Sequence, residues 1–234
     1  MVTAVYGPLG VDVEKLCDRI QTLLAKQTGN QPPKDLPPRD RWSQDDILLI
    51  TYGDSIVDTD STDAESADNE KAAPPPLATL SQFLGQYLLD TITGVHILPF
   101  FPYSSDDGFA VIDYLQVNPE LGTWDDIQCI ASQFDLMTDL VMNHVSSKSD
   151  WFQQFERGED PGKDYFITVA PETDVSGVTR PRSHDLLRPT QTPSGEQQIW
   201  ATFSHDQVDL NFENPDVLIE FLKIIFHYLN TGTK

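Results

Sequence analysis

The fold of this chain is indicated by one short segment, Leu136-Met-Thr-Asp139-Leu-Val-Met-Asn143-His144. It is an apolar run with an acid, an amide and an imidazole toward its end, and such a run is typical of a buried strand. In a (β/α)8 barrel, the carboxyl ends of the parallel strands build the active site. The segment therefore predicts a barrel strand from Leu136 to Met142 that brings Asp139, Asn143 and His144 to a functional site.

Two further βα units precede this strand. Short apolar runs over residues 46–52 and 94–99 predict buried strands, and apolar residues at helical spacing predict helices over residues 77–90 and 123–134. A last helix is predicted over residues 215–230. The fold class is therefore α/β, the N-terminal part of a (β/α)8 TIM barrel with about three βα units.

Residues 145–210 interrupt this alternation. They are rich in Pro, Ser, Gly, Asp and Arg, and structureless loops beyond about 15 residues are uncommon, so we expect an inserted subdomain after strand 3. The expected domains are an N-terminal helix with a proline-rich lead-in over 1–45, two βα units and strand 3 over 46–144, the insertion, and barrel helix 3 over 211–234. The sequence ends before strand 4, which predicts an open sheet edge and association with an absent C-terminal half.

The composition excludes several classes of partner. A formal net charge of −22 repels nucleic acid and anionic membranes. No apolar run approaches the roughly 20 residues of a membrane span. The N-terminus lacks the basic and apolar regions of a signal peptide. We therefore expect a cytoplasmic protein that binds no nucleic acid and no membrane.

Metal and cofactor binding is not expected either. Residues 54–70 carry seven acids and no base, but they lack the ordered spacing of a calcium-binding loop and predict a solvated loop. Cys17 and Cys129 have no Cys or His cluster beside them and predict a reduced pair. The sequence thus predicts no metal and no cofactor.

Two segments carry the main resemblance to a known family. The segment from Asp139 to His144 resembles the first signature region of the α-amylase superfamily, glycoside hydrolase family 13. Residues 94–114, which include Pro99-Phe-Phe-Pro-Tyr-Ser-Ser-Asp-Asp-Gly-Phe109, are similar to the strand and loop of the sucrose phosphorylases and their relatives within that family. A bare Asp-x-x-x-Asn-His is a weak signal, but here it closes a predicted strand after two βα units, as the family requires.

The resemblance extends over about residues 47–228, including residues 203–215, which resemble the family's region at the end of the inserted subdomain. It implies that four residues bind a glucosyl ring: Asp106, Phe109, His144 and Gln207. Physical chemistry agrees, because a carboxylate accepts hydrogen bonds from sugar hydroxyls and an aromatic face covers the C–H side of a pyranose. It implies supporting roles for three more: Asp139, Asn143 and Asp113.

Other polar residues favour structural roles. Asp107 is expected to serve the turn or the solvated surface, and His96 to lie in the core or behind the site. The guanidinium groups of Arg180, Arg182 and Arg188 suit phosphate, but pairing with nearby acids is the preferred interpretation. Asp209 and Asn211 are expected to order the loop before the last helix.

The resemblance also implies an activity that this sequence cannot complete. Family members transfer α-glucosyl groups with retention, using a carboxylate nucleophile and a carboxylic general acid about 5 Å apart. The nucleophile's motif, Arg-x-Asp, does not occur in the 234 residues. We therefore predict no catalytic residues and an N-terminal fragment that is inactive alone.

The intact relatives are implied to be phosphorylases, which convert an α-glucoside and phosphate into glucose 1-phosphate and a released acceptor. The sequence does not choose among fructose, fructose phosphate, glycerol and glycerate as that acceptor. Two alternatives remain open at this point. One is a fragment of a hydrolase of the α-glucosidase or amylase type, and the other is a non-catalytic remnant or interaction module.

Overall fold

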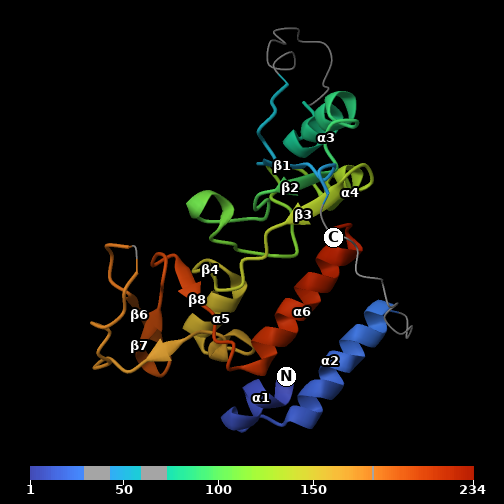
Figure 1. Ribbon diagram of the computed structural model, residues 1–234. Helices are drawn as coiled ribbons and strands as arrows, with labels where there is room; N and C mark the ends of the chain where they lie inside the picture. The colour runs from blue at the N-terminus through green and yellow to red at the C-terminus, as the bar shows by residue number, and fades with distance from the viewer. Residues whose placement is uncertain (29–42, 59–72, 181) are drawn as a thin grey trace. The chain divides into compact units, whose positions relative to one another are not determined.

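The computed structural model describes residues 1–28, 43–58, 73–180 and 182–234 (Figure 1). These residues fall into two compact units. The first, which we call the insert unit, comprises the described residues within 1–35, 103–113 and 141–226. The second, the sheet unit, comprises those within 36–102, 114–140 and 227–234.

The sheet unit is built on three parallel strands in the order β1-β2-β3. They are β1 (Leu48–Thr51), β2 (Gly94–Ile97) and β3 (Asp135–Thr138). Helices α3 (Pro76–Tyr87) and α4 (Trp124–Ala131) connect them. The register aligns Leu49 with Val95 and Val95 with Leu136. This βαβαβ order confirms the predicted partial α/β barrel, in which right-handed βα units repeat.

The third strand is shorter than the sequence predicts. β3 ends at Thr138, which pairs with Ile97, the last residue of β2. Beyond β2 the chain reaches Pro99, which has no N–H with which to continue the ladder. His144 instead begins β4 (His144–Ser146), which pairs antiparallel with β8 (Gln207–Asp209). The predicted strand from Leu136 to Met142 is therefore wrong in its second half.

The outer edge of β3 is partly paired. Thr233 forms a parallel bridge with Leu136, and the backbone N–H of Lys234 donates to the carbonyl of Leu136 at 2.9 Å. At the other edge of the sheet, Leu48 and Ile50 of β1 expose 40% and 59% of their surface. The sheet unit thus presents apolar side chains that nothing in the described residues covers fully.

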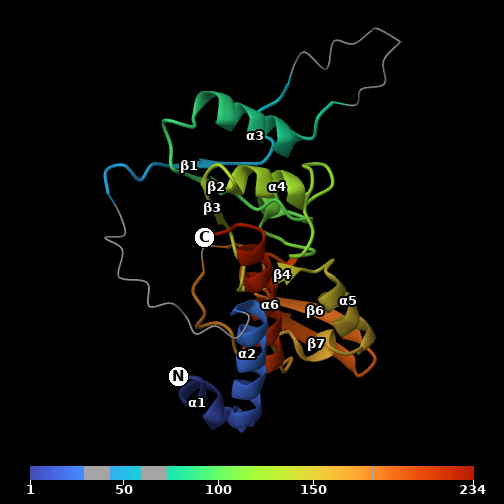
Figure 2. The ribbon, with the colours of Figure 1, turned by 90° about the vertical axis from the view of Figure 1, so that its right-hand side faces the viewer.

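The insert unit contains a second, antiparallel sheet in the order β5-β7-β6. Its strands are β5 (Thr168–Val169), β6 (Leu187–Thr192) and β7 (Gly195–Trp200). Helix α5 (Asp150–Arg157) begins after Ser149, whose hydroxyl accepts a hydrogen bond from the Phe152 N–H at 3.2 Å. Figure 2 shows α5 beside β6 and β7, and the guanidinium carbon of Arg188 in β6 lies 4.8 Å from the Phe152 ring centroid.

Short helical segments complete the chain. They are the 3₁₀ turns η1 (Gly7–Leu9), η2 (Asp106–Gly108) and η3 (Gly162–Asp164). Helix α6 (Pro215–Asn230) has the bounds that the sequence predicts. No helix within the described ranges is long and apolar enough to cross a membrane.

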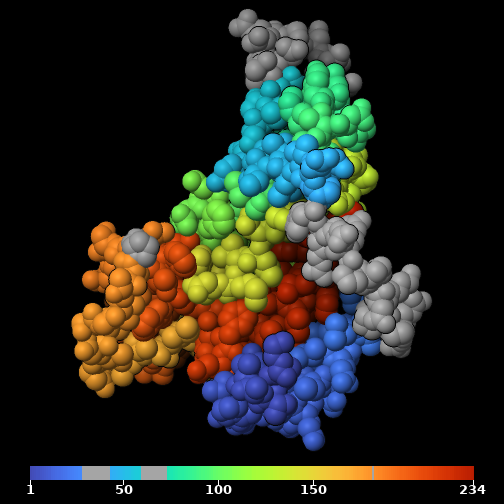
Figure 3. All heavy atoms as spheres, in the orientation of Figure 1, coloured from blue at the N-terminus to red at the C-terminus, as the bar shows by residue number. Residues whose placement is uncertain are grey.

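Two N-terminal helices, α1 (Val2–Tyr6) and α2 (Val13–Thr28), pack against the first part of α6. The Tyr6 hydroxyl donates to the Phe212 carbonyl at 2.9 Å, and Arg19 pairs with Asp216 at 2.6 Å. Figure 3 shows the blue surface of these helices against the red surface of α6. The proline-rich lead-in, and most of the acidic run over residues 54–70, lie outside the described residues.

Candidate functional site

The first part of the site is a closed loop over residues 103–111, which we call the 103–111 loop. Tyr103 and Val111 form an antiparallel bridge at its base. Inside it, the Ser104 N–H donates to the Ala110 carbonyl at 3.0 Å. Asp106 and Asp107 have φ values of 58° and 49°, and Gly108 follows with 104°. Left-handed backbone costs a non-glycine residue about 1–2 kcal/mol, so contacts elsewhere must hold this turn.

The second part is the β4–β8 strand pair, whose register places His144 opposite Asp209 and Ser146 opposite Gln207. His144 and Gln207 are 5% and 2% exposed, respectively. The two strands lie about 60 residues apart in sequence. Only their pairing therefore brings the imidazole of His144 beside the side-chain amide of Gln207. The strand pair thus supplies the buried floor of the site.

Three of the predicted sugar-binding side chains meet in hydrogen-bonding range, and the fourth residue, Phe109, contributes its backbone. The Gln207 Nε2 donates to Asp106 Oδ2 at 2.8 Å. His144 Nε2 lies 3.1 Å from the Phe109 carbonyl oxygen and 3.1 Å from Gln207 Nε2. A carbonyl can only accept, so we assign the imidazole proton to Nε2, and the Gln207 amide then donates to Asp106 alone. Asp106 is exposed, and its described hydrogen bond from Gln207 uses Oδ2.

Burial lowers the pKa of His144 below its usual 6.5, and the hydrogen bond to Phe109 and the charges of Asp209 and Asp106 oppose that shift without cancelling it. The unfolded chain then binds the proton more tightly than the folded chain does. Stability is therefore expected to fall as the pH drops through about 6.5, and to level off below the folded pKa. The imidazole is neutral in the folded protein at neutral pH.

This pKa shift gives a testable pH dependence. An NMR titration should place the pKa of His144 lower in the folded chain than in the chain unfolded by urea. Between about pH 7.5 and about pH 5.5, His144→Gln should lose less unfolding free energy than the unmodified chain. His205→Gln, at an exposed imidazole, is the control and should change this pH dependence little. A folded-state pKa above that of the unfolded chain would contradict the assignment.

Of the two residues expected to order the loop before α6, Asn211 has a contact there, whereas Asp209 bonds to Thr202, which precedes β8. Asp209 Oδ1 accepts from the Thr202 N–H at 3.0 Å, and Oδ2 accepts from the Thr202 hydroxyl at 2.6 Å. Asn211 Oδ1 accepts from the Glu213 N–H at 3.1 Å. Next to Thr202, the Phe203 ring lies 4.9 Å from the His144 ring, centroid to centroid. Asp209 therefore fixes the turn that places Phe203 against the imidazole.

The three framework candidates are divided between the two units. Asp139 lies in the sheet unit, where its Oδ2 is 2.9 Å from Nε2 of His96, so these two side chains support each other there. Asn143 lies in the insert unit, and its amide nitrogen is 3.5 Å from Nδ1 of His144. Asp113 closes the 103–113 segment of the insert unit and is half-buried.

The arginines that the sequence assigned to nearby acids hold backbone carbonyls. Arg180 donates to the Thr202 carbonyl at 3.3 Å and also to the His184 carbonyl. Arg182 donates to the Phe203 carbonyl at 3.2 Å, and Arg188 to the His205 carbonyl at 3.1 Å. Arg188 also lies 4.0 Å from Glu156. These bonds tie the three arginines to residues 202–205, an arrangement that the sequence did not predict.

Sequence reasoning missed one residue, Asp206. Its carboxylate accepts hydrogen bonds from Ser104, Ser105 and Ser147, and the first two belong to the 103–111 loop. No local pattern could have shown this, because Asp206 and Ser104 lie about a hundred residues apart and serine is common in loops.

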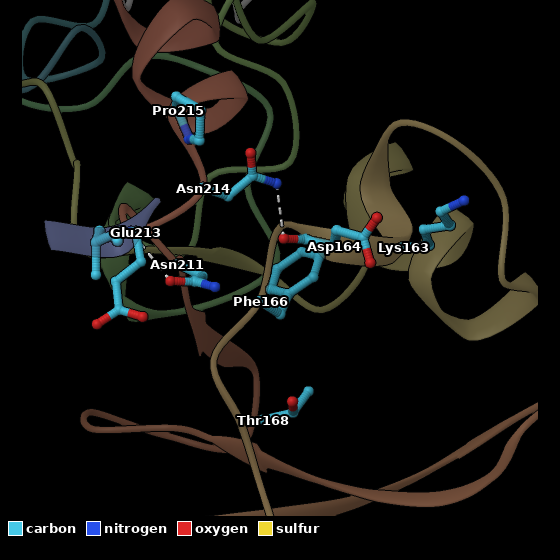
Figure 4. Close-up of a pocket in the computed structure, with 9 residues that line it drawn as sticks. Lys163, Asp164, Phe166, Thr168, Asn211, Glu213, Asn214 and Pro215 are labelled. Carbon is cyan, nitrogen blue, oxygen red and sulfur yellow. Dashed lines mark hydrogen bonds between the residues drawn. The ribbon is translucent and has the colours of Figure 1, made fainter. Parts of the chain in front are cut away.

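A separate hollow of about 480 Å³ lies elsewhere in the insert unit (Figure 4). Its lining includes Lys163, Asp164, Phe166 and Glu213, and the Asn214 side chain donates to the Asp164 carbonyl at 2.9 Å across it. None of the predicted site residues lines this hollow.

Comparison with known proteins places this geometry in context. Residues 85–234 match the family model of the alpha-amylase catalytic domain. A glucosylglycerate phosphorylase from Spirochaeta thermophila is 44% identical over 100% of this chain, which spans 38% of that protein. A second glucosylglycerate phosphorylase, from Allomeiothermus silvanus, is 51% identical over 82% of this chain, with 32% of that protein covered. The chain thus spans about a third of the length of these curated relatives.

A solved structure agrees with the sequence relatives. The crystal structure of the sucrose 6F-phosphate phosphorylase from Thermoanaerobacter thermosaccharolyticum superposes with a TM-score of 0.69 and 31% sequence identity. The match covers 82% of this chain and 39% of that one. The described fold is therefore similar to part of a larger enzyme.

Proposed function

The chain belongs to the α-amylase family, and from this premise we propose that it is the N-terminal part of a retaining α-glucoside phosphorylase of carbohydrate metabolism. Its contribution is the site that holds the glucosyl ring. The observation that carries the proposal is the position of Gln207, whose Nε2 donates to Asp106 at 2.8 Å and lies 3.1 Å from His144 Nε2. The similarity to glucosylglycerate phosphorylases supports a glucosylglycerate-type substrate.

Each side chain has a chemistry that suits a pyranose. The carboxylate of the exposed Asp106 accepts hydrogen bonds from sugar hydroxyls, and charge-assisted bonds of this kind are stronger than neutral ones. His144 is neutral and buried, so it holds the Phe109 carbonyl beneath the proposed sugar site without the cost of a buried charge. Phe109, half-buried in the same loop, supplies an apolar face for the C–H side of the ring.

The bond-breaking step is proposed to lie outside this chain. Retaining transfer needs a free nucleophilic carboxylate and a protonated acid about 5 Å apart. In the described site, Asp106 is bonded to Gln207, and both carboxylate oxygens of Asp209 are bonded to Thr202. Both oxygens of Asp209 are thus already bonded, and the Arg-x-Asp motif that would supply the nucleophile does not occur in the 234 residues. We therefore propose sugar binding, and no cleavage, for the 234 residues alone.

The proposed partners are an α-glucoside, phosphate and the remaining strands of the barrel. Exposed Leu48 and Ile50 on β1, and Met137 on β3, offer the sheet unit's apolar surface to such strands. A cytoplasmic location is part of the proposal, and the charge of −22 supports it by disfavouring membrane association.

The proposal is tested by joining this chain to the C-terminal part of a relative. One joined enzyme takes that part from the Spirochaeta protein, and the other takes it from the sucrose 6F-phosphate phosphorylase of Thermoanaerobacter thermosaccharolyticum. Each is expected to form glucose 1-phosphate from its relative's own glucoside and phosphate, because this chain supplies the shared glucosyl site. The 234-residue chain and each C-terminal part alone should form none.

Two outcomes would count against this function. Release of free glucose without glucose 1-phosphate would favour the hydrolase alternative. Inactivity of both joined enzymes, with both intact relatives active in the same assay, would favour a non-catalytic module.

A further inference from the structure

Asp206 holds one side of the candidate site through its carboxylate. Oδ2 accepts from the hydroxyls of Ser104 and Ser105, each at 2.5 Å, and Oδ1 accepts from the hydroxyl of Ser147 at 2.7 Å. The backbone adds a further link, since the Ser147 N–H donates to the Asp206 carbonyl at 2.7 Å. One side chain therefore joins the 103–111 loop to the residue after β4.

The hydrogen bonds around Ser104 have a fixed direction. An ionised carboxylate can only accept, so the single hydroxyl proton of Ser104 goes to Asp206. The Ser146 hydroxyl, which also contacts the Ser104 hydroxyl, must then donate to it. Ser146 in turn accepts from the Lys148 N–H at 2.9 Å and is fully buried. A chain of donors thus ends on Asp206, and each bond polarises the next.

The carboxylate is charged where it lies. Burial disfavours the ionised form of Asp206, but the hydroxyls of Ser104, Ser105 and Ser147, with the charge of Lys148, outweigh that effect and hold its pKa below the usual range. An ionised acceptor binds hydroxyl donors more strongly than a neutral one does.

Ser104 and Ser105, the loop residues bonded to Asp206, come immediately before the left-handed pair Asp106 and Asp107. The residue after Asp206 is Gln207, which donates to Asp106 itself. Two consecutive residues therefore hold the turn. Asp206 bonds to the serines that precede the left-handed pair, and Gln207 bonds to Asp106 within that pair. Two adjacent left-handed aspartates persist only where the surroundings fix them.

We propose that Asp206 is a positioning residue, which holds the 103–111 loop in the conformation that presents Asp106 and Phe109 to the glucosyl ring. The sugar-binding part of this inference rests on the proposed function, whereas the ordering of the loop does not. Asp206 acts through the two loop serines and does not itself touch the sugar.

The test measures loop order without any ligand. Amide hydrogen exchange is followed at Ser104, Phe109 and Ala110, whose N–H groups close the loop. Asp206→Ala is expected to speed exchange at these amides about tenfold, since a lost hydrogen bond to a charged group has an effect of at least that size. Asp206→Asn keeps one acceptor oxygen and should restore part of the protection. Asp174→Ala removes an exposed carboxylate that accepts from Ser176 elsewhere in the insert unit, and is the matched control.

Sugar binding is measured in parallel with methyl α-D-glucopyranoside as the probe, by NMR shifts of the 234-residue chain. Asp206→Ala should lose the probe-induced shifts that the unmodified chain shows, while Asp206→Asn and the control variant retain them. Unchanged exchange in Asp206→Ala would overturn the proposal whatever the sugar result. Faster exchange with undiminished binding would overturn the positioning role. A lack of binding by the unmodified chain would instead count against the proposed function and leave the exchange result to decide loop order.

Discussion

Asp106→Asn is expected to lower kcat/KM of the joined enzymes roughly 10- to 100-fold, because a hydrogen bond to a charged group contributes about 1.5–3 kcal/mol. The substitution removes the charge and one acceptor oxygen. It preserves the size of the side chain, and asparagine tolerates the left-handed backbone at φ 58° as well as aspartate does. Steady-state rates of glucose 1-phosphate formation measure the effect.

The neighbouring acid provides the control for this prediction. Asp107 is also exposed and left-handed, with φ 49°, but it has no described bond to Gln207 or His144. Asp107→Asn should therefore change kcat/KM less than about twofold, within the range of most surface substitutions. Equal losses in the two variants would mean that the loop, and not the Asp106 carboxylate, determines activity.

Phe152→Ala is expected to destabilise the insert unit by about 3–5 kcal/mol, the range for truncating a buried aromatic side chain. Phe152 is fully buried, and its ring lies 5.5 Å from that of Phe155 and 5.0 Å from that of Phe166. Its removal leaves a cavity that these rigid rings cannot fill. Urea unfolding followed by tryptophan fluorescence checks this, since Trp151 and Trp200 lie in the same unit.

Two further variants serve as controls for this experiment: one is a smaller truncation at Phe152, and the other is a substitution at an exposed residue. Phe152→Leu retains most of the volume and should cost less than half as much as the alanine variant. Val178→Ala, at a side chain 41% exposed, should shift the unfolding midpoint little. A small effect of Phe152→Ala would show that the aromatic cluster does not stabilise the unit.

Local pattern was sufficient for the barrel helices and for the existence of the barrel strands, but not for α1 and α5. Helix α6 has its predicted bounds, α4 and β2 lie within the predicted ranges, and α3 begins one residue earlier than predicted, because apolar spacing is set by the geometry of each element alone. The boundary of β3 was wrong because strand length depends on a partner. Pro99, in a different element, removes the N–H that would extend the ladder past Thr138.

For the candidate site too, the sequence predicted one part, and the other part depended on contacts between distant elements. The residues of the site could be chosen from the motifs at residues 106–109, 139–144 and 207, because the family resemblance rests on those motifs. The contacts between these residues could not be predicted from the motifs. They depend on the β4–β8 register, which brings Gln207 beside His144 and within hydrogen-bonding distance of Asp106. Asp206 was missed for the same reason, as its serine partners are recognisable only after the chain has folded.

The sequence by itself thus determined the alternation of strands and helices, the family resemblance and the absence of an Arg-x-Asp nucleophile motif. Those properties depend on residue identity and short-range spacing. Only the tertiary structure decided that His144 belongs to an antiparallel pair, that Gln207 donates to Asp106, and that Asp206 accepts from the loop serines. Hydrogen bonds across a hundred residues depend on strand register and burial, which no local spacing encodes.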